Sequence, residues 1–243
     1  MHLMKQFVIM CGGKGTRLKI LKNKYPKCLV KINKKTLLEH QIQLARKYKF
    51  QEIILLTGHK YSIINKFLKK KLFKKIITIK DKKKLGNGGA LLNALEYLGN
   101  EFCLIYCDIL TNINLYKLYL FFKKKKSDFC LVVNKNNNFH DSNLVKFNNN
   151  KIISNIYLYP HKKIPKNSYS NESIFMCKKN KLVNIKKKFF NKKSDFVKDL
   201  VPELLKTSNI SAYKTNEYTI DCGTPERLTE ARINFRSIFK KKK

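Results

Sequence analysis

The sequence has no tryptophan, only five arginines and only 16 acidic residues among 243, against 53 lysines and arginines together. It also has no stretch near the roughly 18 consecutive apolar residues that a membrane-spanning helix requires. The apolar run in residues 1–10 is too short for a secretory signal, because Gly12 and Gly13 interrupt it. These absences predict a soluble, cytoplasmic protein with no membrane partner.

The seven cysteines are an odd number and include no C-x-x-C pair. Disulfide frameworks and zinc sites usually show even numbers or paired spacings, so neither is expected here. Most of these cysteines lie in apolar runs, where a thiol behaves as a small buried hydrophobe. Cys103 and Cys107 flank a run typical of a strand, so we expect both on one face, packed in the core.

The net charge of +37 is carried almost wholly by lysine, in runs such as residues 69–71, 82–84 and 123–126. Such a charge raises a non-enzymatic alternative, a basic protein that binds nucleic acid or an anionic surface. Nucleic-acid readers, however, favour arginine, whose planar fork makes bidentate contacts. Asparagine is abundant together with lysine, a combination typical of an A/T-rich genome. We therefore interpret the charge as biased composition and expect no specific nucleic-acid partner.

Short apolar runs alternate with longer mixed segments in the first half of the chain, a pattern that predicts strands joined by helices. The predicted strands are 7–10, 52–57, 76–79, 102–106, 129–133, 144–147, 152–159, 173–177, 210–214 and 218–221. The predicted helices are 36–48, 61–71, 88–98, 115–125, 194–205 and 224–239. Thr36 and Glu39 fit a capping box for the first helix, Ser194 fits a cap, and Pro225 fits the first position of the last helix.

This order of elements predicts one α/β domain over residues 1–243. We expect a Rossmann-like (GT-A-like), mostly parallel mixed sheet flanked by helices, with a small β portion that binds the substrate. The nucleotide-binding half is expected at about residues 6–133. The substrate half and a closing helix are expected at 134–238.

Three glycines in four positions follow the first predicted strand, within residues 12–17 (Gly-Gly-Lys-Gly-Thr-Arg). Glycines let a backbone approach a ligand closely and direct N–H groups at it, and Arg17 adds a rigid cationic fork for phosphate oxygens. The pattern is neither the G-x-x-x-x-G-K-[ST] phosphate loop nor the dinucleotide fingerprint. It predicts a phosphate-binding loop of another type.

Four segments in order resemble the signature of the sugar-phosphate nucleotidyltransferase family. They are residues 12–18 (GGKGTRL), 26–29 (PKCL), 85–90 (LGNGGA) and 221–227 (DCGTPER). The resemblance runs from about residue 6 to residue 238. It implies an enzyme with a nucleoside triphosphate and a sugar 1-phosphate as its partners, which releases pyrophosphate and forms a nucleotide sugar.

Residues 134–145 and 215–228 are most similar to the D-glycero-D-manno-heptose-1-phosphate guanylyltransferases within this family. This narrower resemblance implies GTP and a manno-heptose 1-phosphate, and a product for surface polysaccharide such as lipopolysaccharide or capsule. The alternative is a cytidylyl-, uridylyl- or thymidylyltransferase acting on another sugar phosphate or on phosphocholine. The sequence does not define an oligomeric state.

The resemblance also implies a role for individual residues. Arg17 and Lys27 are the expected catalytic cations, and Asp108 and Asp221, each at a strand end, are the expected ligands of one Mg²⁺ ion. The expected nucleotide contacts are Cys11, Gly12, Gly13, Lys14, Gly15, Thr16, Arg17, Leu85, Gly86, Asn87, Gly88 and Gly89. The expected sugar contacts are Asp141, Ser142 and Asn171, while Cys107 and Ser173 stand where relatives have glycine.

Overall fold

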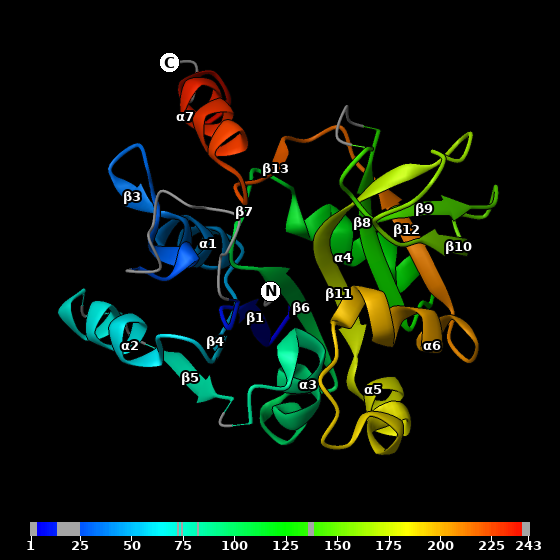
Figure 1. Cartoon of the computed structure of the whole chain (residues 1–243), viewed down its shortest axis with the longest axis horizontal. Helices are drawn as coiled ribbons and strands as arrows, with labels where there is room; N and C mark the ends of the chain where they lie inside the picture. The colour runs from blue at the N-terminus through cyan, green and yellow to red at the C-terminus, as the bar shows by residue number, and fades with distance from the viewer. Residues whose placement is uncertain are drawn as a thin grey trace.

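A nine-stranded mixed sheet runs through the computed structural model, which describes residues 4–13, 25–71, 73, 75–81, 83–135 and 139–239 (Figure 1). Its parallel part has the order β6-β1-β4-β5. These strands are β1 (Gln6–Met10), β4 (Glu52–Thr57), β5 (Ile76–Lys80) and β6 (Glu101–Tyr106). β1, β4 and β6 are largely buried on both faces, as parallel strands usually are, whereas β5 at the edge of the sheet is partly exposed.

The second part of the sheet is built around its longest strand, β11 (Tyr169–Lys178), which runs antiparallel to β6, β8 and β9. The other strands here are β8 (Phe129–Asn134), β9 (Leu144–Phe147), β10 (Ile153–Tyr157) and β12 (Ile210–Lys214). The mixed α/β sheet flanked by helices that the sequence predicts is therefore confirmed. Its division into halves at residue 133 stays a prediction.

Helices cover both faces of the sheet because successive side chains of each strand point to opposite sides. In β1, Phe7 and Ile9 join one buried cluster, and Val8 and Met10 join the other. The first cluster is covered by α1 (Leu37–Lys47), α2 (Tyr61–Lys70) and α4 (Leu115–Lys124). The second is covered by α3 (Gly86–Asn93), α5 (Lys179–Lys186) and α6 (Val201–Leu205).

The start of α1 is fixed locally by the predicted capping box. The hydroxyl of Thr36 accepts a hydrogen bond from the backbone N–H of Glu39 at 3.1 Å, and the Glu39 carboxylate accepts one from the N–H of Thr36 at 2.7 Å. Two otherwise unpaired N–H groups are thereby satisfied. Arg46 and Lys47 lie in the last turn, where cations favour the helix dipole.

Short elements outside the main sheet place the last third of the chain against the first. The strands β7 (Ile109–Thr111) and β13 (Thr219–Asp221) pair antiparallel, and β2 (Lys31–Ile32) pairs with β3 (Lys35–Thr36). Helix α7 (Pro225–Phe239) packs Leu228, Ala231 and Phe235 onto these pairs. The remaining short helices are η2 (Lys27–Leu29), η3 (Leu95–Tyr97) and η4 (Lys187–Phe189).

The helix predicted over residues 194–205 differs from the structure at its start. Its cap is Asp195, whose carboxylate accepts hydrogen bonds from the N–H groups of Val197 and Lys198, at 2.9 Å each. Ser194 was the wrong cap because its own backbone bonds to Leu85 and Gly88 instead. The first turn, η5 (Phe196–Leu200), is a π-helix that continues into α6.

Other boundaries also differ from the predictions. The helix predicted over 88–98 begins at Gly86 and ends at Asn93, and η3 follows it. Helix α5 and the strands β2, β3 and β7 were missed. In α5 only Leu182 and Ile185 are buried, so lysine and asparagine dominate its sequence and hide the helical period.

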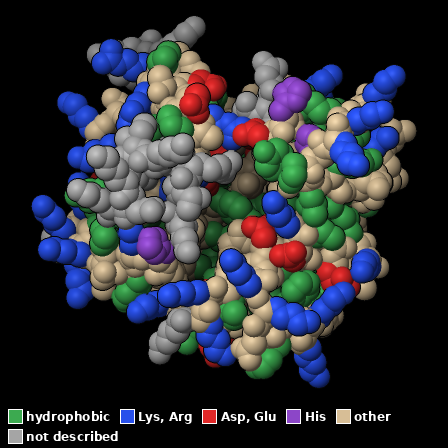
Figure 2. Space-filling model, viewed as in Figure 1, with side chains coloured by type: hydrophobic (Ala, Val, Ile, Leu, Met, Phe, Trp, Pro, Cys, Tyr) green, Lys and Arg blue, Asp and Glu red, His purple; other side chains and the backbone are tan. Residues whose placement is uncertain are grey.

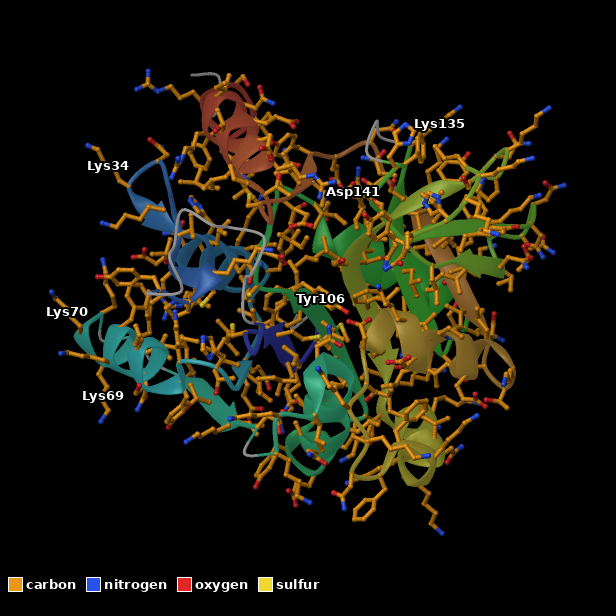
Figure 3. All side chains as sticks on the ribbon, in the orientation of Figure 1. Lys34, Lys69, Lys70, Tyr106, Lys135 and Asp141 are labelled. Carbon is orange, nitrogen blue, oxygen red and sulfur yellow. The ribbon has the colours of Figure 1, made fainter. Side chains whose placement is uncertain are left out.

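The cysteines agree with the sequence analysis. All seven are buried and free, and Cys103 and Cys107 belong to one core cluster as predicted. Within the described residues, no helix is both long and apolar enough to cross a membrane. Lysine and arginine side chains are spread around the whole outline of the face in Figure 2. Lys34, Lys69, Lys70 and Lys135 all project from the margins of the molecule (Figure 3).

Candidate functional site

A pocket of about 350 Å³ is hollowed into the middle of the face shown in Figure 2. It lies beyond the end of β6, between the β7–β13 pair, β11 and the start of α7. Its volume suits a small ligand. Four acidic residues line it, which are Asp108, Asp141, Glu172 and Asp221, together with two cations, Lys198 and Arg227.

Lys27 contacts Asp108 and Asp221, two of the residues that line this pocket. Lys27 begins η2, its side chain is only 10% exposed, and its ammonium group pairs with Asp108 and lies 3.6 Å from Asp221. The pairing of β13 with β7 sets Asp221 opposite Ile109, beside Asp108. The N–H of Cys222 also donates to the carbonyl of Asp108 at 2.9 Å.

The charges of these three residues stabilise one another. Burial by itself would lower the pKa of Lys27, but the charges of Asp108 and then Asp221 outweigh it, so the pKa is raised. Burial would raise the pKa of Asp108, yet Lys27 outweighs it, and a hydrogen bond with Asp221 adds to the lowering. Lys27 and Asp108 are therefore both charged at neutral pH.

The two carboxylates fit a Mg²⁺ ion. They are hard oxygen donors within hydrogen-bonding reach of each other. No cluster of three or more His, Cys, Asp or Glu side chains suited to a metal occurs in the described part of the chain. A Mg²⁺ ion held by two carboxylates alone would need other ligands, such as substrate phosphates and water, to complete its shell.

Arg227 crosses the pocket wall and joins two distant segments. Its guanidinium donates to Asp221 at 3.2 Å and also to Asp141, and its side chain is only 11% exposed. Asp141 lies in the polar loop before β9, toward the middle of the molecule like Tyr106 (Figure 3). Residues 134–145 and 215–228, which carry the narrower resemblance, therefore meet at the pocket. Ser142 and Asn171 line the same pocket.

An irregularity in β11 shapes the facing wall. The register between β11 and β8 shifts between Asn171 and Phe175, and Ser173 has a φ of 55°. This left-handed conformation favours glycine, the residue expected at this position from the resemblance. The bulge exposes Asn171 and Ser173 partly and turns Glu172 inward, where it lines the pocket at 6% exposure.

Glu172 is held in an environment that disfavours its charge. Burial raises its pKa to about 8, Arg227 opposes this shift, and the charge of Asp221 adds to it. Glu172 is thus largely protonated at neutral pH and can donate as well as accept a hydrogen bond.

The glycine loop after β1 is described only at its beginning. Gly12 packs against Gly58, whereas a side chain at Gly13 would meet nothing within 4 Å, so this position faces open space. Lys14, Gly15, Thr16 and Arg17 lie outside the described residues, and their phosphate contacts stay predictions.

Three thiols join the segments that carry the site. The buried thiols of Cys11, Cys28 and Cys107 lie close enough together to shift one another's pKa. They precede Gly12, follow Lys27 and precede Asp108 respectively. Cys11 directs its thiol into the protein, so a nucleotide contact there, which stays a prediction, would involve its backbone.

The second predicted nucleotide loop, residues 85–90, packs against residues 192–196. A side chain at Gly86 would lie 2.4 Å from the carbonyl oxygen of Ser194, and one at Gly88 would lie 3.0 Å from it. The Asn87 amide donates to Asp195 at 2.7 Å and accepts from the N–H of Phe196 at 2.6 Å. Leu85, Gly86 and Gly89 share this packing. Contact between this loop and a nucleotide stays a prediction.

Sequence reasoning missed three charged residues of the pocket lining, which are Glu172, Lys198 and Arg227. Arg227 could have been found, since it is one of five arginines and closes the DCGTPER segment. Glu172 gave no signal, because its place in the pocket wall depends on the irregularity in β11. Lys198 gave no signal in a chain so rich in lysine.

The raised pKa of Glu172 predicts a pH-dependent stability difference. Because its folded pKa of about 8 lies above the ordinary 4.5, folding binds a proton, and this group destabilises the fold as pH rises through that window. The difference in unfolding free energy between Glu172→Gln and the unsubstituted protein should therefore shift in favour of the variant as pH rises from about 4.5 to 8. Above about pH 8 this difference should stay constant. Urea unfolding of both proteins across this range measures it. A difference independent of pH would contradict the assignment.

The comparisons with known proteins agree with this geometry. Residues 6–237 match the protein family described as Nucleotidyl transferase. The chain is 29% identical over 230 residues to the D-glycero-alpha-D-manno-heptose 1-phosphate guanylyltransferase of Campylobacter jejuni, covering 94% of this chain and 99% of that protein. It is 32% identical to a probable glucose-1-phosphate cytidylyltransferase of Bacillus subtilis, over 49% of this chain and 56% of that protein.

Solved structures have the same fold. HddC from Yersinia pseudotuberculosis superposes with a TM-score of 0.81 at 25% identity, covering 96% of this chain and 100% of that one. A putative glucose-1-phosphate thymidylyltransferase from Bacillus anthracis superposes with a TM-score of 0.84 at 20% identity, covering 98% of each chain. With a family match over nearly its whole length, this chain belongs to the nucleotidyl transferase family of enzymes.

Proposed function

We propose that the protein transfers GMP from GTP to a manno-configured heptose 1-phosphate, with D-glycero-D-manno-heptose 1-phosphate as the expected acceptor. Pyrophosphate leaves, and the GDP-sugar serves surface polysaccharide synthesis. We place the reaction in the cytoplasm, with no specific nucleic-acid partner. The observation that carries the proposal is the contact of Arg227 with Asp141 and Asp221.

This contact supports the heptose assignment because it joins the two segments that are similar to the heptose guanylyltransferases. Both segments lie at one pocket, and each contributes a charged side chain to its wall. The similarity to the Campylobacter jejuni enzyme over nearly both chains gives independent support.

The proposed chemistry is an in-line displacement at phosphorus. An oxygen of the sugar phosphate attacks the α-phosphorus of the nucleotide, and the bond to the bridging oxygen of the departing pyrophosphate breaks. The attacking oxygen is already anionic, so the reaction needs no general base. It needs positive charge, because two anions must approach each other.

Lys27 is proposed to contribute to that charge together with the Mg²⁺ ion that its partners Asp108 and Asp221 would hold. Lys27 is nearly buried and is held by two carboxylates, so it costs little reorganisation when phosphate oxygens approach. Arg17 and the N–H groups of the glycine loop are proposed to bind the remaining phosphate oxygens. Asp108 and Asp221 would hold Mg²⁺, which supplies further neutralisation of phosphate charge when bound. Asp141, Ser142 and Asn171 are proposed to contact the sugar.

The two carboxylates predict dependence on a hard divalent cation. We expect EDTA to abolish activity, and Asp108→Asn and Asp221→Asn each to lower turnover by at least about 100-fold, as loss of a main electrostatic partner does. Pyrophosphate release with added Mg²⁺ measures this. Glu230→Gln, on the exposed side of α7, is the control that also removes one carboxylate. Near-normal turnover in either aspartate variant would remove that residue from the metal site.

The proposed substrates predict a clear order among nucleotides. A site that hydrogen-bonds guanine leaves buried polar groups unpaired when a pyrimidine enters, which can cost about 10⁴-fold. We expect GTP with heptose 1-phosphate to exceed CTP, UTP and dTTP, and to exceed mannose and glucose 1-phosphates as acceptors. Pyrophosphate release across this matrix is the measurement.

The same matrix separates the alternatives. Preference for CTP would favour the cytidylyltransferase reading, for which the partial similarity to the Bacillus subtilis protein is the supporting observation. Preference for UTP or dTTP would likewise overturn the guanylyl assignment while leaving the reaction class intact. Absence of pyrophosphate with every pair would overturn the proposed reaction.

A further inference from the structure

The two cations that line the pocket differ in how they are paired. Arg227 is held between Asp141 and Asp221, so its charge is already balanced within the protein. Lys198 lines the same pocket from η5, is exposed, and forms no ion pair with any residue of the described ranges. Lys198 therefore brings a positive charge into the pocket that forms no ion pair with a described residue.

Three aspartates line the pocket, and the only other described cation in its wall, Arg227, is paired with two of them, so a ligand that carries a phosphate needs such a cation. Phosphate oxygens near Asp141 or Asp221 would be repelled, whereas an ammonium group attracts them and donates up to three hydrogen bonds. Of the described lining residues, Lys198 alone offers this without first breaking an ion pair.

The backbone that carries Lys198 is held from the second loop. Asp195 caps η5 through the N–H groups of Val197 and Lys198. Asn87 in turn binds the Asp195 carboxylate at 2.7 Å and the Phe196 N–H at 2.6 Å, across a sequence separation of 108 and 109 residues. The same amide also donates to the hydroxyl of Tyr106, another pocket residue, at 3.2 Å.

Glycines allow the backbone of the loop 85–90 to approach the backbone of Ser194 closely. The N–H of Ser194 donates to Leu85 at 2.8 Å, and the N–H of Gly88 donates to Ser194 at 2.9 Å. A side chain at Gly86 or Gly88 would meet the Ser194 backbone, so only glycine allows this approach. The turn that carries Lys198 and the loop 85–90 therefore form one unit. π-helical turns such as η5 are frequent at functional sites.

We propose that Lys198 binds the phosphate of the sugar phosphate, and that Asn87 positions Lys198 by holding the turn 195–198 against the loop 85–90. This inference rests on the proposed function, because it names the group that receives the acceptor substrate. It also gives Asn87 a role that the sequence did not indicate. The predicted contact between Asn87 and the nucleotide is a separate expectation, which this role does not replace.

The test compares Michaelis constants for the two substrates. Lys198→Ala should raise KM for the sugar phosphate at least about tenfold, the loss typical of a hydrogen bond to a charged group, and leave KM for the nucleotide unchanged. Lys198→Arg should recover part of that loss. Lys193→Ala removes an equally exposed lysine from the segment before η5 and outside the pocket, so it should leave both constants unchanged.

Asn87→Ala should raise KM for the sugar phosphate as well, by a smaller factor. The double variant should be no worse than Lys198→Ala, because both substitutions remove one interaction. Thermal unfolding verifies that each variant is folded. Independent, multiplying effects of the two substitutions would overturn the positioning role, as would a rise in nucleotide KM for Asn87→Ala with no change for the sugar phosphate.

A calorimetric titration with mannose 1-phosphate, without nucleotide, measures binding of a sugar phosphate directly. It separates this inference from the proposed function. Binding that is lost in Lys198→Ala and kept in Lys193→Ala supports the inference even if turnover is slow. An active enzyme whose sugar-phosphate KM is the same in Lys198→Ala overturns the inference alone. An unsubstituted protein that neither binds nor turns over any sugar phosphate overturns both.

Discussion

The ammonium group of Lys27, buried between Asp108 and Asp221, is the interaction on which the rest of the site depends. Taking these charges out of water costs several kcal/mol per ion, so the arrangement persists only because each charge meets its partners. The partners come from η2, the end of β6 and β13, three elements far apart in sequence. The β7–β13 pair and the packing of α7 hold β13 in place. They thus fix the position of Asp221, which contacts the ammonium group of Lys27.

Asp221 extends this arrangement across the pocket, because it contacts both Lys27 and Arg227. Arg227 then reaches Asp141 on the opposite wall. Asp221 thereby connects the proposed phosphate side of the pocket with the proposed sugar side. The predicted nucleotide loop 85–90 makes a second connection to the proposed acceptor side, because Asn87 contacts the turn that carries Lys198. Both connections are polar and partly buried, so each constrains geometry more than a surface contact would.

The sequence predicted elements whose signals are local, and failed where distant segments decide the structure. Helix α1 was predictable because Thr36 and Glu39 cap it within one turn. Lys27, Asp108 and Asp221 were predicted because each belongs to one of the segments that resemble the family or, for Asp108, lies at a strand end. Asp195 displaced Ser194 as a cap because Ser194 pairs with the loop 85–90, more than 100 residues away in sequence, which no local pattern reveals. Glu172 likewise lines the pocket only because β11 shifts register against β8.

A double-mutant cycle of unfolding free energy on Lys27 and Asp108 tests most directly whether this buried charge pair organises the site. Lys27→Met leaves Asp108 without its cation, and Asp108→Asn leaves Lys27 with only the more distant Asp221, so each should destabilise the fold, the first by about 3–5 kcal/mol and the second by less. The double variant should be more stable than the sum of the single effects allows, with a coupling of about 0.5–3 kcal/mol. Additive effects, or single substitutions that leave the unfolding free energy unchanged, would contradict the account.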